Sequence, residues 1–154
     1  MSPTAPRPAL APRILVSFVA VVTMVSPYIA DWNATHIYNP TWPPHAKFHN
    51  AQTMLLGLAL GACALFTVWR GAGGARLSLR TATVFGALYW ITQLGSITFP
   101  GTAYVDPGAG SGLLFGFLPG QVFAGLVLLT LLGVALALDG RAARAGRQDN
   151  LAPS

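Results

Sequence analysis

The chain of 154 residues contains no glutamate, one cysteine and one lysine. Its four acidic residues are all aspartates, and charged residues make up 8% of the chain, far below the roughly one quarter of an ordinary soluble domain. A lone cysteine excludes an intramolecular disulfide or redox pair, so packing is the default role of Cys63. Without glutamate, covalent or paired-carboxylate catalysis has few candidate residues.

Apolar residues are abundant instead, at 53% of the chain. They form four uncharged stretches, at 14–30, 51–69, 81–99 and 118–138, each close to the about 17 to 25 residues that cross a bilayer. Pro43 and Pro44 suit the first turn of a helix and extend the second stretch to about 44–69. We therefore expect an all-α fold: a four-helix transmembrane bundle in one membrane domain, with flexible tails at 1–12 and 140–154.

The basic residues predict the orientation of this bundle. Arginines precede the first stretch, separate the second from the third and follow the fourth, whereas Lys47 lies elsewhere. The positive-inside rule then places both termini in the cytoplasm, and the two longer loops, one containing Asp106, on the outer side. The net charge of +5 is thus an orientation signal and not evidence for nucleic-acid binding. Arginine-rich, lysine-poor composition favours the bacterial cytoplasmic membrane.

A cleaved signal peptide is the alternative interpretation of the first stretch, because Arg7 and Arg13 precede it. The stretch ends in Pro27, Tyr28, Ile29 and Ala30, which is no small-x-small cleavage site. We therefore expect it to remain as a span.

All three histidines lie in the segment DWNATHIYNPTWPPHAKFHN, from Asp31 to Asn50. His45 and His49 lie one helical turn apart, and Gln52 continues their face. In the third stretch, Tyr89, Gln93 and Ser96 follow a helical spacing toward its outer end. We expect an outer pocket with His49, Gln52 and Gln93 on its floor and Asp31, His36 and His45 at its mouth, and Asn39 and Tyr89 as further ligand-binding residues.

Three interpretations of this segment remain open. The first is a transition-metal site for zinc, copper or iron, with Asp31, His36, His45 and His49 as ligands. The second is acid–base catalysis or transport of a small lipophilic substrate, with a histidine as proton carrier and Asp31 orienting it. The third is a non-catalytic binding or assembly protein, in which tryptophans and tyrosines form an interfacial belt and the histidines satisfy loop carbonyls.

Three other motifs carry weaker signals, and one cofactor is disfavoured. Gly57 and Gly61 have the GxxxG spacing that lets another helix approach, within the chain or in an oligomer. The run GAGSG, residues 108–112, lacks the strand and lysine of a phosphate-binding loop and reads as a hinge or lid. The sequon at Asn33 is too close to the membrane for glycosylation. Haem is disfavoured because all histidines lie in one segment.

The pattern D-x-N-x-T-H-x-x-N-P-x-W-P-P-H-A-K-F-H, from Asp31 to His49, resembles a group of small four-span membrane proteins of unknown function. The resemblance implies the four-span layout over about residues 14–138. It assigns no catalytic role, but it is a further reason to treat Asp31, His36, Asn39, His45 and His49 as one site.

Overall fold

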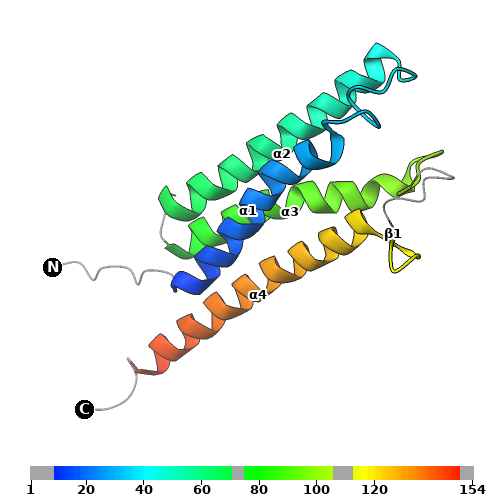
Figure 1. Cartoon of the computed structure of the whole chain (residues 1–154). Coiled ribbons are helices and arrows are strands. Elements are labelled where there is room, and N and C mark those ends of the chain that lie inside the picture. Colours follow the sequence, from blue (N-terminus) through cyan, green and yellow to red (C-terminus); the bar gives the residue numbers. More distant parts are fainter. Residues whose placement is uncertain (1–8, 71–74, 106–112, 150–154) are drawn as a thin grey trace.

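The computed structural model describes residues 9–70, 75–105 and 113–149. Four helices dominate this part of the chain: α1 (Leu10–Asp31), α2 (Pro44–Arg70), α3 (Ala75–Gly95) and α4 (Gly120–Asp149) (Figure 1). A 3-10 turn, η1 (Ser96–Thr98), follows α3, and two strands of two residues each, β1 (Leu113–Leu114) and β2 (Leu118–Pro119), pair before α4. The expected all-α architecture is confirmed. Asp106 and the GAGSG run lie outside the described residues.

Consecutive helices run in opposite directions (Figure 1). Where α1 begins and α2 ends, the Trp69 indole N–H donates to Ser17 Oγ at 2.9 Å, and the Arg13 guanidinium lies 4.0 Å from the centre of the Trp69 ring. At the opposite end, Asn50 of α2 donates to Asp31 of α1 at 2.7 Å. The α1–α2 pair is therefore fixed at both ends, and α1 packs against all three other helices.

Helices α1, α2 and α4 are long and apolar enough to cross a membrane by length and composition. Large apolar side chains on their outer faces are exposed, including Phe18, Phe66 and Leu126. Such continuous apolar exposure is unfavourable in water and favourable in hydrocarbon. The fold therefore has the character of a membrane protein.

Several helix ends differ from those expected. Helix α1 begins at Leu10 instead of residue 14, because Pro12 is tolerated in a first turn. Helix α3 gives way to η1 after Gly95, before the expected end at 99. Helix α4 begins at Gly120 instead of 118, since Leu118 and Pro119 pair with β1. It continues to Asp149, so the tail expected from 140 is helical there, and its alanine and arginine are strong helix formers.

The β1–β2 hairpin turns through two residues in the left-handed region, Phe115 (φ 56°) and Gly116 (φ 80°). Phe115 and Phe117 are 84% and 75% exposed at its tip. The expectation that this apolar segment dips back to the membrane surface stays a prediction.

The two helices of the first hairpin, α1 and α2, approach closely at the GxxxG pair. A Cβ added to Gly57 would lie 2.8 Å from the Thr23 carbonyl oxygen, and one added to Gly61 would lie 2.5 Å from the Ala20 carbonyl oxygen. Only glycine permits this contact. The pair thus serves packing within the chain, and α1 occupies its face.

One buried hydrogen bond connects α1 with α3. The Trp90 indole N–H donates to Thr23 Oγ1 at 2.8 Å, and the Thr23 hydroxyl donates to the Val19 carbonyl oxygen at 2.9 Å. Both side chains are buried, so the hydroxyl satisfies an indole that has no access to water. This bond fixes the rotation of α3 and with it the direction of the neighbouring Tyr89.

Candidate functional site

The loop between α1 and α2 is folded by two Asn-x-Thr turns. Asn33 Oδ1 accepts from the Thr35 amide at 2.8 Å and from its hydroxyl at 2.6 Å. Asn39 Oδ1 accepts from the Thr41 amide at 2.9 Å and from its hydroxyl at 2.7 Å. Asparagine favours such turns because its side chain can mimic a backbone turn. Asn39, expected to bind a ligand, thus supports the loop.

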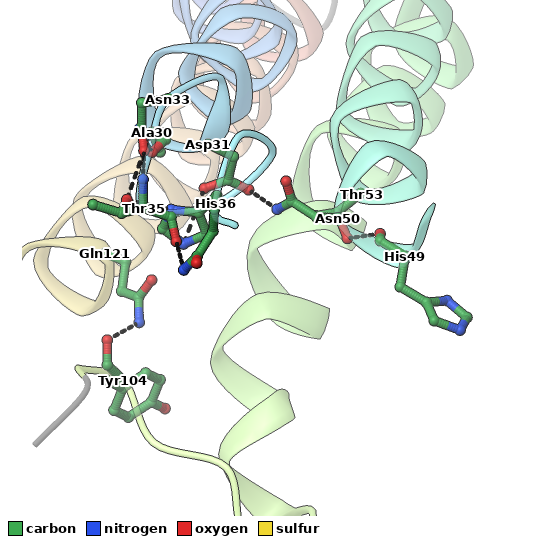
Figure 2. A network of polar contacts seen from close by, with 11 residues as sticks. Ala30, Asp31, Asn33, Thr35, His36, His49, Asn50, Thr53, Tyr104 and Gln121 are labelled. Carbon is green, nitrogen blue, oxygen red and sulfur yellow. Dashed lines mark hydrogen bonds and ion pairs between the residues drawn. The ribbon is translucent and has the colours of Figure 1, made fainter. Parts of the chain in front are cut away.

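Asp31, at the C-terminal end of α1, is the centre of a polar cluster (Figure 2). Its Oδ2 accepts from Asn50 Nδ2 at 2.7 Å, and its Oδ1 lies 3.7 Å from His36 Nε2. The Asp31 side chain is 18% exposed, so these two neighbours replace much of the water that a carboxylate would otherwise bind.

The hydrogen bonds around His36 determine its tautomer. His36 Nδ1 lies 2.8 Å from Thr35 Oγ1, and the Thr35 hydroxyl donates its single proton to Asn33. Nδ1 must then carry a hydrogen and donate to Thr35. The second proton of the ring is gained or lost at Nε2, the nitrogen that faces Asp31. At 3.7 Å from Asp31 Oδ1, Nε2 lies within ion-pair distance of the carboxylate but beyond hydrogen-bond distance.

A cavity of about 530 Å³ opens beside this cluster. Its wall includes Asp31 from the end of α1, His36 from the following loop, Asn50 from α2 and Gln93 from α3. The lining residues are Ser26, Pro27, Ala30, Asp31, His36, Asn50, Thr53, Leu56, Tyr89, Trp90, Thr92, Gln93, Ser96, Gly120, Gln121 and Ala124. All four helices thus contribute to one pocket at the end of the bundle where α1 ends.

The segment after α3 holds the start of α4 against this pocket. The Tyr104 hydroxyl donates to the Leu94 carbonyl oxygen at 2.8 Å, and Gln121 Nε2 donates to the Tyr104 carbonyl oxygen at 2.6 Å (Figure 2). These two bonds fix the position of Gln121 on the pocket wall.

Of the expected site residues, Asp31, His36, Tyr89 and Gln93 line the pocket. His45, His49 and Gln52 do not; they are exposed on another face of α2, and the His49 ring points away from Asp31 (Figure 2). His49 Nε2 lies 3.0 Å from His45 Nε2, and His49 Nδ1 lies 3.2 Å from Gln52 Oε1. In place of the expected His49 and Gln52, α2 contributes Asn50 and Thr53 to the pocket.

The four expected metal ligands form two separate pairs, Asp31 with His36 and His45 with His49. Among residues 9–70, 75–105 and 113–149, three or more histidine, cysteine or acidic side chains are nowhere gathered as a metal would require. The geometry does not support one four-ligand metal centre. It leaves one aspartate–histidine pair and one pair of histidines, and the two pairs differ in the chemistry that they can perform.

Asn50, Thr53 and Gln121 were missed as site residues. Asn50 could have been found from helical spacing, because it continues the buried stripe of Met54, Gly57 and Gly61 by one turn. Gln121 had no such signal, since its position depends on the fold of the connection before α4.

The comparison with known proteins gives a family and no activity. A family of unknown function, DUF6640, matches residues 15–150. No curated protein matches the chain, and neither does a solved structure.

Proposed function

The chain belongs to DUF6640, a family of unknown function, and we propose that it is a four-span membrane protein whose outer pocket binds a small lipophilic ligand. The observation that carries this proposal is the cavity of about 530 Å³, which lies within the range of roughly 300 to 1,000 Å³ of small-molecule sites. Its lining combines apolar side chains, Pro27, Leu56 and Trp90, with the Asp31 cluster. A ligand with an apolar part and a polar part matches this lining.

The four-span layout is supported by the path of the chain. Helices α2 and α4 run in the same direction (Figure 1), so α3 must return from the end of α2 to the start of α4. Beyond Arg80, α3 carries no charged residue. Arg13 lies near the start of α1, Arg70 at the end of α2, Arg80 near the start of α3 and Arg141 in the second half of α4, so all four lie toward the helix ends opposite the pocket, which favours a cytoplasmic location for that end. The pocket then faces the outer side of a bacterial cytoplasmic membrane.

A pocket-filling variant tests ligand binding. Ala124 lines the pocket, whereas Ala137 lies on the exposed face of the same helix. Protein purified in lipid nanodiscs is extracted, and the small molecules that copurify with it are measured by mass spectrometry. We expect a species that is depleted in Ala124→Trp and retained in Ala137→Trp. Identical profiles for wild type and both variants would contradict the proposal.

Acid–base catalysis on the bound ligand is the second candidate. It is favoured by the tautomer of His36, which leaves Nε2 as the proton-exchanging atom beside Asp31. Membrane extract is incubated with wild type, His36→Asn or His49→Asn, and the metabolites are compared. Catalysis predicts a conversion that is lost in His36→Asn and kept in His49→Asn. If no conversion depends on His36, the protein is a binding or carrier protein.

A further inference from the structure

The pocket presents hydrogen-bond acceptors that lack protein donors. Asn50 Oδ1 and Gln93 Oε1 are buried and, within the described residues, accept no hydrogen bond. Both residues line the same cavity. A buried amide oxygen without a partner destabilises the fold, so such atoms persist where something else satisfies them.

The orientation of the Asn50 amide is fixed. Its Nδ2 donates to the Asp31 carboxylate at 2.7 Å, and a flipped amide would place its oxygen against that carboxylate. Oδ1 is therefore held as the unsatisfied atom. Gln121 shows the same pattern, because its Nε2 is bound to the Tyr104 carbonyl oxygen and its oxygen remains as the acceptor.

Three of the five side-chain hydroxyl groups that line the pocket add further acceptors. Thr53 Oγ1 donates to the His49 carbonyl oxygen at 3.1 Å, Thr92 Oγ1 to the Leu88 carbonyl oxygen at 2.8 Å, and Ser96 Oγ to the Thr92 carbonyl oxygen at 2.8 Å. Each hydroxyl has one proton, so these three retain only lone pairs for a ligand.

The charges of the lining residues also favour a ligand that donates hydrogen bonds. Asp31 is an acceptor when ionised, and the lining residues that the structure describes include no lysine or arginine. His36 is the lining group that becomes positive on protonation, and its Nε2 is directed at Asp31. An anionic ligand head would face unscreened oxygen atoms, whereas an ammonium group offers three donors and a positive charge.

We propose that the pocket recognises an amphiphile with a primary amine head. The head donates to Asn50 Oδ1, Gln93 Oε1 and the Asp31 carboxylate, and the apolar tail lies along Leu56 and Trp90. This inference rests on the proposed function, since it specifies the ligand of the same pocket.

Three probes with the same tail test the inference: hexylamine, hexanol and hexanoate. Binding to protein in nanodiscs is measured at neutral pH by calorimetry, with empty nanodiscs to subtract partition into lipid. We expect hexylamine to bind about tenfold or more tightly than hexanol, because hydrogen bonds to charged groups are the stronger ones, and hexanoate to bind most weakly.

Gln93→Leu and Asn50→Leu should each lower the affinity for hexylamine about tenfold and that for hexanol less. Gln52→Leu, on the exposed face of α2, is the matched control. Gln93→Leu leaves the Asp31 bond intact and decides the question if Asn50→Leu does not fold.

The outcomes separate the two proposals. If none of the probes binds above empty nanodiscs, the pocket function itself fails. If the probes bind without preference for the amine, or hexanoate binds best, the pocket function stands and the amine head is wrong. The amine head is also wrong if Gln93→Leu behaves like Gln52→Leu.

Discussion

Asn50 Nδ2 donates to Asp31 Oδ2 at 2.7 Å, and this bond joins the second turn of α2 to the last residue of α1. It connects residues 19 positions apart across the whole interhelical loop. One amide thereby holds the mouth of the pocket and orients the carboxylate within it.

Replacing Asn50 with leucine should destabilise the folded protein. The Asp31 carboxylate, already mostly shielded, would lose its donor at a cost of about 1 to 3 kcal/mol. Thermal unfolding in detergent measures the effect, with Gln52→Leu on an exposed position of the same helix as the control. Equal unfolding temperatures for the two variants would show that the bond contributes nothing to stability.

The α1–α2 contact predicts a large effect of one methyl group. Gly61→Ala would place its Cβ against the Met24 side chain and 2.5 Å from the Ala20 carbonyl oxygen, and overpacking of this kind typically costs about 1 to 3 kcal/mol. Gly133→Ala adds the same group where nothing lies within 4 Å. We expect a lower unfolding temperature for Gly61→Ala only. The close approach is wrong if both variants unfold like the wild type.

The bond between Trp90 and Thr23 gives a third stability prediction. Thr23→Val keeps the shape of the side chain but leaves a buried indole N–H unpaired, at about 1 to 3 kcal/mol. Thr130→Val is the control, because the exposed Thr130 hydroxyl only donates to Leu126 of its own helix. Thermal unfolding should give a lower unfolding temperature for Thr23→Val than for Thr130→Val. Equal unfolding temperatures would show that the bond does not stabilise the α1–α3 contact.

Cysteine labelling tests the orientation. In a Cys63→Ser background, Pro40→Cys lies in the loop beside the pocket and Ala75→Cys at the start of α3, near the opposite end. An impermeant maleimide added to intact cells should label position 40 and reach position 75 only after permeabilisation. The reverse pattern would place the pocket on the cytoplasmic side.

We propose that the His45–His49 pair, whose Nε2 atoms lie 3.0 Å apart, binds a transition metal ion, since two imidazoles one turn apart can bind one ion from one face. Zinc titration of the purified protein should detect a site whose affinity for zinc falls by at least about tenfold in His45→Ala or His49→Ala. Even the loss of a residue that only hydrogen-bonds to a metal ligand lowers metal affinity by about this factor. His36→Ala should leave it unchanged. A joint loss in His36→Ala and His45→Ala would instead indicate the single four-ligand centre that the structure does not form.

The helices could be predicted from the sequence because each apolar stretch extends over several helical turns without a charged residue. The site was less predictable because adjacent helical positions differ by about 100° in direction. His49 and Asn50 are neighbours in sequence, yet one points out of the bundle and the other lines the pocket. The histidines favoured a site on the face of α2 that carries His45 and His49. The pocket instead lies on the face that carries the buried residues Met54, Gly57 and Gly61.

The connections before α4 could not be predicted from composition. The sequence predicts that an apolar helix starts at Leu118, but Leu118 pairs with Leu114 in a hairpin. Gln121 reaches the pocket only through its bond to Tyr104, which is 17 residues away. Such positions follow from tertiary contacts and leave no periodic signal in the chain.

Pro27 lies inside α1, one turn before Asp31, and it is buried on the pocket wall. Proline has no amide hydrogen, so the helical bond to the Thr23 carbonyl oxygen cannot form. That oxygen faces Gly57, where a methyl group would collide with it. The last turn of α1 is thereby attached less tightly than the turns below it. Asp31 therefore sits on a helical turn that lacks one backbone hydrogen bond to the turn before it, and the Asn50 amide ties that turn to α2 instead.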